Sequence, residues 1–358
     1  MIKDRSPRVR QLLNDLELDA FCFFHRPNMR YLCGFTGTDG VLAVTADTDC
    51  FLTDSRYATQ ASAEVVAGAI REYKSKEEGL VAWLDERQIK RVGFEAEHLS
   101  CAALRRLREK SPATLEWVAV ERPVASLRGI KGADEVAGLE RATALAAAAF
   151  ADVLPLLTPG SSERDVALAL EMAMRRRGGD EKAFATIVAS GPRGALPHGV
   201  ASDKLLEAGE LVTIDFGVCC DGYHSDETVT VALGNVSAEL AAIHAIVLAA
   251  HDLAIAAIKP GLPLCQIDAV ARDYIVAQGY GERFGHGLGH GVGLEVHEFP
   301  TVSPRSEEVA SAGMVFTVEP GIYLPGFGGV RIEDMVLVTV DGCRRLTRLE
   351  KNLLILPA

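Results

Sequence analysis

The chain has 358 residues and a formal net charge of -12, and 48% of its residues are hydrophobic. This length allows two or three domains with sizeable cores, while the negative charge argues against a nucleic-acid surface, because phosphate contacts need clustered Lys and Arg. The polar stretch 1–10 shows no signal-peptide pattern, and the longest apolar runs are broken by His and Asp, so we expect a cytoplasmic protein that crosses no membrane. The eight cysteines are scattered and form no C-x-x-C pair.

Strand-like and helix-like runs alternate through the first third of the chain. The expected strands are 20–24, 40–45, 50–53, 91–94 and 115–120, and the expected helices are 8–18, 57–66, 77–86 and 101–110. This alternation predicts an α/β domain with a mixed sheet over residues 1–125. A boundary is expected near 121–131, because Arg122-Pro123 stops the last strand and Gly129 and Gly132 loosen the chain that follows.

The rest of the chain, 126–358, shows a repeated pattern. Helices are expected at 134–157 and 163–177, a strand at 184–189, and a strand pair at 211–216 and 228–233. Helices at 238–258 and 264–278 then precede a second strand pair at 314–318 and 332–340. Two helices followed by a hairpin therefore occur twice, which indicates a duplicated unit with pseudo-twofold symmetry.

Four acidic residues occupy similar places in the two strand pairs. Asp215 ends one apolar strand and Asp226 opens its return strand, while Glu319 ends the corresponding strand and Glu333 lies in its return. Burying a carboxylate is costly unless a cation compensates it. A partner Lys or Arg would explain one such acid alone, but four acids placed alike favour a metal site in a cleft between the two repeats.

Three histidines, His286, His290 and His297, lie within the glycine-rich run 285–298. Glycine at this density lets the backbone pack close to a ligand. One His with four carboxylates is a mostly hard-oxygen donor set, which suits manganese, cobalt, iron or zinc better than a thiolate-bound metal. Five protein ligands exceed what one catalytic ion normally takes, so the set favours two bridged ions.

These motifs together resemble the pita-bread metallopeptidases, the family that contains methionine aminopeptidase, aminopeptidase P and prolidase. The resemblance is carried by the Asp-x10-Asp spacing, the His-x3-His-x6-His run, and the motifs Val318-Glu319-Pro320-Gly321 and Arg331-Ile332-Glu333-Asp334. Within the family, the chain is similar to the proline-directed branch, and the runs 28–37 and 52–57 look like the extra domain of bacterial Xaa-Pro peptidases. The resemblance implies a creatinase-like N-terminal α/β domain, 1–125, and a pita-bread catalytic domain, 126–358.

The resemblance also implies a ligand set for two divalent ions, with manganese favoured and cobalt, zinc or iron as alternatives. Asp215 and Asp226 would bind one ion, and His290 and Glu319 the other. Asp226 and Glu333 would bridge the pair. Glu319 would in addition take the proton from the attacking water.

Four further roles are implied around these ligands. His198 would position the substrate, His286 would shape the pocket, and His297 would contact the scissile carbonyl or the intermediate. Arg331 would support the metal carboxylates.

A few positions stand outside this pattern. The family often has an Arg where this chain has Val229, which leaves local pairing and subsite detail open. His224 could lie on the same face as Asp226, although we favour a supporting or surface role for it. His244 and His251 share one face of an expected helix, which explains them better than catalysis.

The resemblance implies a hydrolase of short peptides that works as a homodimer. Our leading hypothesis is an Xaa-Pro aminopeptidase, which removes the residue preceding proline; the alternative is an Xaa-Pro dipeptidase (prolidase), which shares the same ligands. A more remote alternative is a non-hydrolytic binding module of the same fold, although such relatives generally lose several of the five ligands.

Overall fold

A computed structural model describes residues 5–358 of the chain. Residues 1–4, part of the polar stretch that we expected to lack a signal peptide, lie outside the described residues. The chain divides into two compact units, an N-terminal unit that ends at Arg128 and a C-terminal unit that begins at Gly129.

The N-terminal unit is built on a six-stranded sheet with the strand order β4-β3-β2-β1-β5-β6. β1 pairs antiparallel with β2 and parallel with β5, so the predicted mixed sheet is confirmed. The elements of this unit are α1 (Ser6–Asp15), β1 (Ala20–Phe23), α2 (Arg26–Cys33), β2 (Val41–Thr45), β3 (Asp49–Thr53), α3 (Ala58–Glu64), β4 (Ala69–Glu72), α4 (Lys76–Asp85), β5 (Arg91–Glu95), α5 (Cys101–Lys110), β6 (Glu116–Val120) and α6 (Ala125–Gly129). Trp83 and Leu84 of α4 and Leu107 of α5 are buried in its core with strand residues.

The sequence pattern did not indicate helix α2. Pro27 occupies its first turn, where proline is tolerated because the missing N–H has no helical partner. Gly34 ends the helix with a φ of 86°, a left-handed conformation that suits glycine. Met29 and Leu32 are buried, so packing stabilises a helix that would be too short to form in isolation.

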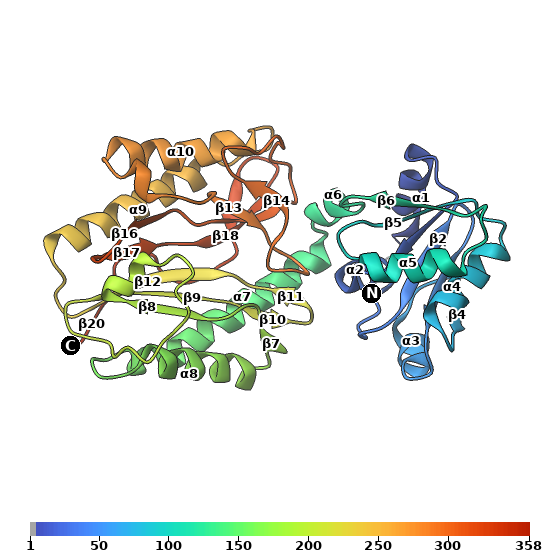
Figure 1. Ribbon diagram of the computed structural model, residues 1–358. Coiled ribbons are helices and arrows are strands. Elements are labelled where there is room, and N and C mark those ends of the chain that lie inside the picture. Colours follow the sequence, from blue (N-terminus) through green and yellow to red (C-terminus); the bar gives the residue numbers. More distant parts are fainter. Residues whose placement is uncertain (1–4) are drawn as a thin grey trace. The chain divides into compact units, whose positions relative to one another are not determined.

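The first half of the C-terminal unit contains α7 (Ala133–Val153), α8 (Glu163–Arg176), β9 (Leu211–Phe216) and β12 (Glu227–Leu233), and the second half contains α9 (Ala238–Ala257), α10 (Leu264–Ala277), β15 (Val315–Val318) and β18 (Asp334–Val338). In each half two helices precede one antiparallel strand pair, and each half has a hydrophobic core of its own. Figure 1 shows α7 and α8 on one side of the strands and α9 and α10 on the other. The predicted pita-bread fold with its duplicated unit is confirmed.

Shorter elements complete this unit: η1 (Leu154–Leu156), β7 (Glu181–Lys182), β8 (Ile187–Ser190), η2 (Gly191–Ala195), β10 (Val218–Cys220), β11 (Tyr223–His224), η3 (Gly281–Arg283), β13 (Gly289–Gly291), β14 (Glu298–Val302), β16 (Gly321–Leu324), β17 (Gly328–Arg331), β19 (Cys343–Arg345) and β20 (Ile355–Leu356). The main strands form two sheets, β20-β12-β9-β8 in the first half and β14-β13-β15-β18-β19 in the second. The C-terminal strand β20 thus pairs with β12 of the first half.

The strand predicted over 332–340 is shorter in the structure, where β18 covers Asp334–Val338 and pairs with β15. The chain leaves β17, which forms a hairpin with β16 that the sequence pattern did not indicate, and then enters β18 in a different sheet. Ile332 and Glu333 lie between these strands, and the amide of Glu333 donates to the carbonyl of Thr228 in the first half. The apolar run hid this change of sheet, because both segments are buried and periodicity cannot separate them.

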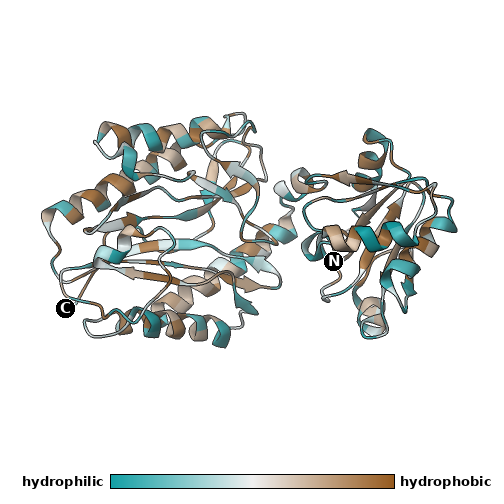
Figure 2. Cartoon of the chain, in the orientation of Figure 1, coloured by the Kyte–Doolittle hydropathy of each residue, from teal (hydrophilic) through white to brown (hydrophobic). Residues whose placement is uncertain are grey.

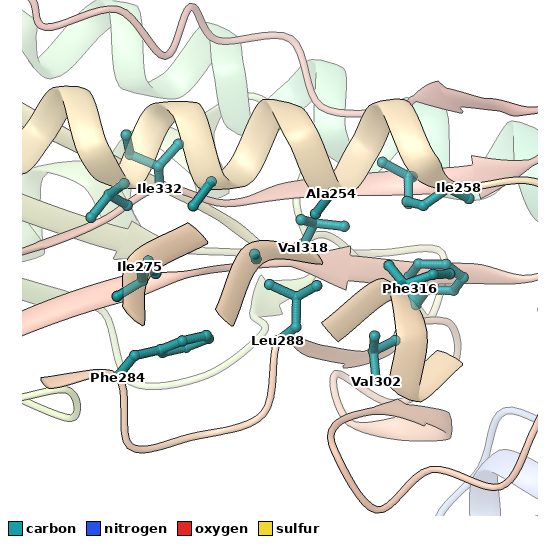
Figure 3. Close-up of a cluster of buried hydrophobic side chains, with 14 of the residues drawn as sticks. Ala254, Ile258, Ile275, Phe284, Leu288, Val302, Phe316, Val318 and Ile332 are labelled. Atoms are coloured by element: carbon teal, nitrogen blue, oxygen red, sulfur yellow. The ribbon is translucent and has the colours of Figure 1, made fainter. Parts of the chain in front are cut away.

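Helix α9 is long and apolar enough to cross a membrane by length and composition alone. In Figure 2 much of it carries the brown of hydrophobic residues. Ala254 of this helix lies in the core of the second half, beside Val318 and Phe316 (Figure 3). Packing in this core therefore accounts for the buried face of α9.

Candidate active site

A cavity of about 860 Å³ opens in the C-terminal unit. Its lining includes every residue that the sequence analysis named as a site residue: His198, Asp215, Asp226, His286, His290, His297, Glu319, Arg331 and Glu333. These side chains come from both halves of the duplicated unit, so the two hairpins meet at this cavity.

Three of the five candidate ligands have atoms that all lie within 4.8 Å of one another, namely Asp226, His290 and Glu333. His290 lies in β13, and its Nε2 is 3.6 Å from Oδ2 of Asp226 and 3.5 Å from Oε1 of Glu319. One imidazole nitrogen thus faces carboxylates from both hairpins. Asp215 lies in β9 opposite Thr228 of β12.

Strand register explains how the second hairpin presents its two acids. Val318 pairs with Asp334, so Glu319 and Glu333 occupy the next positions at the same end of β15 and β18. Oγ1 of Thr228 donates to Oε2 of Glu333 at 2.7 Å and thereby fixes that carboxylate from the first half. The Glu333 side chain is buried, so this bond helps to set its orientation.

The glycines on either side of His290 are required by close packing. A Cβ on Gly289 would lie 1.9 Å from the carbonyl oxygen of Thr317, and one on Gly291 would lie 2.2 Å from that of Phe299. Only glycine lets β13 pass between β14 and β15 at this distance. The backbone of His290 is held there because its amide donates to Oγ1 of Thr317 at 3.1 Å.

Burial and mutual repulsion shift the pKa values of the acids. Burial, followed by the charge of Glu333, raises the pKa of Asp226 well above its usual range, and burial also raises that of Glu333. Burial raises the pKa of Glu319 to about 8, against the opposing effect of Arg331. A divalent cation would favour the charged forms of these carboxylates and so relieve both penalties.

The pKa of His290 is lowered to about 4, chiefly by burial and then by the charge of His297. His290 is therefore neutral near pH 7, the form in which an imidazole binds a metal. Its Nδ1 lies 3.2 Å from the carbonyl oxygen of Gly291, which leaves Nε2 directed at the acids. The rings of His290 and His297 have centroids 4.1 Å apart.

Arg331 occupies the side of the cavity next to Asp215, with Nη2 donating to Oδ2 of that residue at 2.6 Å. Its Nη1 donates to the hydroxyl of Tyr323 at 3.1 Å and to the carbonyl of Pro197 at 3.0 Å. The Tyr323 hydroxyl also lies 2.9 Å from Nε2 of His286. A single hydrogen-bonded chain therefore orients Asp215, Tyr323 and His286.

The remaining candidates lie nearer to solvent. His198 and His297 are exposed, and both border the cavity. Burial lowers the pKa of His297, so it too is largely neutral near pH 7. Both rings can donate or accept a hydrogen bond with a ligand that enters the cavity.

The donor set fits divalent metal ions. Oδ1 of Asp215 is buried and has no hydrogen-bond partner among the described residues. The crowded acids next to it hold raised pKa values, as expected of carboxylates whose compensating charge is a cation. Four carboxylates with one neutral imidazole suit manganese, cobalt, iron or zinc.

The structure also answers two questions left by the sequence. Val229 packs in the core of the first half, while its neighbours Thr228 and Thr230 donate to Glu333 and to the carbonyl of Arg331. Strand alternation thus places no side chain of position 229 in the site. His224 contacts the carbonyl of Gly293, in keeping with a supporting role.

Several residues that shape the site were not predicted from the sequence. Tyr323 lies two residues beyond the motif Val318-Glu319-Pro320-Gly321, so this motif could have directed attention to it. Asp268 and Arg272 form an i,i+4 pair on α10 that holds the histidine run: Arg272 donates to the carbonyl of His286, and Asp268 accepts from the amide of Leu288. No local signal marks that role, because the contact joins segments distant in sequence.

Two family models match the chain. Residues 137–340 match metallopeptidase family M24, and residues 5–130 match the creatinase/prolidase N-terminal domain. Among curated proteins, an uncharacterized peptidase of Bacillus subtilis is 44% identical over 98% of this chain and 99% of its own length. An Xaa-Pro dipeptidase of Pyrococcus horikoshii is 36% identical over 99% of both chains.

Solved structures show the same likeness. An Xaa-Pro dipeptidase from Bacillus anthracis has 41% identity and a TM-score of 0.96, with 98% of this chain and 99% of that chain covered. An X-Pro aminopeptidase from Thermotoga maritima has 37% identity and a TM-score of 0.90, with 99% of this chain and 100% of that chain covered.

Proposed function

Since the chain belongs to metallopeptidase family M24, we propose that it hydrolyses Xaa-Pro dipeptides. Peptide substrates follow from the family, whereas the proline preference and the dipeptide length are our proposal. The relatives from Pyrococcus horikoshii and Bacillus anthracis are Xaa-Pro dipeptidases, which favours a dipeptidase. The aminopeptidase hypothesis, which led in the sequence analysis, is not confirmed and stays a prediction supported by the Thermotoga maritima structure.

One observation carries the proposal: Asp215, Asp226, His290, Glu319 and Glu333 all border one cavity. We propose that they hold two divalent ions, Asp215 and Asp226 one of them, and His290 and Glu319 the other. Asp226 and Glu333 would be shared between the ions, in agreement with the close grouping of Asp226, His290 and Glu333. Manganese is the proposed ion.

When bound, two such ions polarise the scissile carbonyl and activate a water. The side chains then have separate tasks. Glu319, held charged by the bound ions, accepts the proton of the water. His297 and His198 contact the peptide from the open side of the cavity, while Arg331 keeps Asp215 in place.

The charges of the cavity suit the two ends of a dipeptide. The acidic cluster attracts the N-terminal ammonium of the substrate. A dipeptide also carries a carboxylate next to the scissile bond, and a cation must compensate it. Among the described residues, the Lys and Arg side chains bordering the cavity are Arg283 and Arg331, and Arg331 is already paired with Asp215.

Arg283 therefore becomes the proposed partner of the substrate carboxylate. It is exposed in η3 at the border of the cavity, and no described acid pairs with it. A volume of about 860 Å³ leaves room for a short peptide, since ligand pockets measure roughly 300–1,000 Å³.

The test compares an Xaa-Pro dipeptide, its C-terminal amide and an Xaa-Pro-Xaa tripeptide, using protein reconstituted with manganese. We expect the dipeptide to be cleaved with the highest kcat/KM, and Arg283→Met to raise KM for the dipeptide without changing KM for the amide. Efficient cleavage of the tripeptide, with release of its first residue, would favour the aminopeptidase. Cleavage of none of the three would contradict the whole proposal.

Three further points remain predictions: a homodimer, a cytoplasmic location and the identity of the ion. A non-hydrolytic binding module is disfavoured, because all five candidate ligands are present and grouped. The metal content of the purified protein distinguishes the hydrolase from the binding module, since a binding module would carry no stoichiometric metal.

A further inference from the structure

A second cluster of charged side chains lies behind the acids of the cavity. Glu227 directly follows Asp226, and Asp334 directly follows Glu333. Neighbouring residues of an extended chain direct their side chains to opposite faces. Asp226 and Glu333 border the cavity, while Glu227 and Asp334 are fully buried on the other side of the same strand ends.

Lys351 lies between these two buried carboxylates. Its Nζ is 2.6 Å from Oε1 of Glu227 and 3.3 Å from Oδ1 of Asp334. The side chains of Glu227, Asp334 and Lys351 are 0%, 1% and 2% exposed, so solvent does not weaken these pairs. Lysine is rarely buried to this extent unless it is paired.

The cluster connects the two halves of the duplicated unit. Glu227 begins β12 in the first half, and Asp334 begins β18 in the second. The segment around Lys351 binds both: the amide of Leu349 donates to Oε1 of Glu227 at 3.0 Å, and Oγ1 of Thr347 donates to Oδ1 of Asp334 at 2.5 Å. One stretch of chain thus spans the two strand ends that carry the inner acids of the cavity.

His251 and Arg345 complete the surroundings of Asp334. Nε2 of His251 lies 3.2 Å from Oδ2 of Asp334, and Nε of Arg345 lies 3.3 Å from the same oxygen. Asp334 therefore has partners besides Lys351, whereas Lys351 is the cation that contacts Glu227 among the described residues. The lysine contributes most where the first half would otherwise hold an uncompensated charge.

We propose that Lys351 is a positioning residue for the metal pair. By binding Glu227 and Asp334 together, it fixes the separation of the strand ends that present Asp226 and Glu333, the two carboxylates that would be shared between the ions. This inference rests on the proposed function. Without the ammonium group, two buried carboxylates on facing strand ends lose their shared partner, and the strand ends move apart.

The first experiment measures metal binding to Lys351→Met. Calorimetric titration of the metal-free protein with manganese, and the visible absorption spectrum with cobalt, report the sites independently of turnover. We expect the more weakly bound of the two ions to lose about 10–100-fold in affinity, the range seen when supporting contacts of metal ligands are removed. The kcat should fall, while KM for the dipeptide should change little.

Lys204→Met is the matched control. Nζ of Lys204 binds Glu210 at 2.7 Å, but neither residue adjoins a candidate ligand in sequence. The control should lower the midpoint of thermal unfolding slightly and leave both metal affinities unchanged. If Lys351→Met binds both ions with wild-type affinity and loses only stability, as the control does, the positioning role is wrong.

A second variant decides the matter if Lys351→Met does not fold. Glu227→Gln keeps an acceptor for Lys351 and Leu349 but removes one charge of the cluster. We expect it to fold and to weaken the second ion in the same direction, and wild-type affinity in this variant would overturn the proposal. Failure of the wild-type protein to bind two ions or to cleave any of the peptides would instead contradict the proposed function itself.

Discussion

Replacing Arg331 by Met tests how the site holds Asp215. The guanidinium makes a 2.6 Å bond to Oδ2 of Asp215 and three weaker bonds to Tyr323, Pro197 and Thr228. Its side chain is 4% exposed and that of Asp215 is 13% exposed. Methionine keeps most of the length but removes the charge and every donor, so Asp215 becomes a buried acid without its partner.

Breaking a buried ion pair from one side costs about 3–5 kcal/mol, and the partial exposure of Asp215 places the expected loss near the lower end. For a domain of this size, a loss of about 3 kcal/mol lowers the unfolding midpoint by roughly 6–12 °C. The measurement is thermal unfolding of metal-free protein in the presence of a chelator. Adding manganese should narrow the difference between the variant and the wild-type protein, because a bound cation compensates Asp215.

Two comparisons sharpen this test. Arg331→Lys keeps the charge but loses the planar fork that reaches several acceptors, so it should fall between the wild-type protein and the Met variant. Lys204→Met removes a less buried pair and should cost at most about 1 kcal/mol. If Arg331→Met lost no more than that control, the desolvation of the guanidinium would balance its bonds, and the reasoning would fail.

Three further predictions concern activity, packing and pH. Glu319→Gln should fold and still lose at least about 10³-fold in kcat, because the proton acceptor is gone; near wild-type turnover would remove this residue from its role. Gly289→Ala should lower the midpoint of thermal unfolding and weaken metal binding in calorimetry, because the added Cβ would lie 1.9 Å from the carbonyl oxygen of Thr317. Gly285→Ala is the control: its Cβ would meet no atom within 4 Å, so the unfolding midpoint should stay unchanged. Burial lowers the pKa of His244 to about 4, so this residue is neutral in the folded protein near pH 7. The unfolded chain binds a proton there at about pH 6.5, so the free energy of unfolding should decrease as the pH falls from about 6.5 to 4. In urea unfolding, His244→Gln should reduce this dependence of the unfolding free energy on pH, and an unchanged dependence would contradict the argument.

The sequence pattern anticipated most of this fold because its signals are local. Alternating runs indicated the mixed sheet of the N-terminal unit, and two helices followed by a strand pair appeared twice in the rest of the chain. The glycines beside His290 predicted a close backbone approach, and the contacts at Gly289 and Gly291 show why no larger residue fits. Asp215, Asp226, Glu319 and Glu333 were marked by their places at strand ends, which the sheet register then brings to one cavity.

The parts that escaped prediction depend on contacts between distant segments. The hydrophobic pattern around Ile332 and Glu333 gives no sign that the chain passes there from one sheet into another. Lys351 lies in a polar segment near the end of the chain, where a lysine usually faces solvent, and only the facing acids explain its burial. The pairing of Arg272 with Asp268 was visible as an i,i+4 spacing, but its hold on the histidine run was not.

The path of the final segment has a consequence for folding during synthesis. β20 completes the sheet of the first half beside β12, and Lys351 neutralises Glu227 at the start of that same strand. The first half is translated early, yet it stays unfinished until the ribosome has produced all of the second half. The apolar side chains of α9 likewise have no complete core to pack in until β15 and β18 have been synthesised. The C-terminal unit should therefore fold in one cooperative step after its last strand emerges, and removal of residues 349–358 should leave both halves unstable.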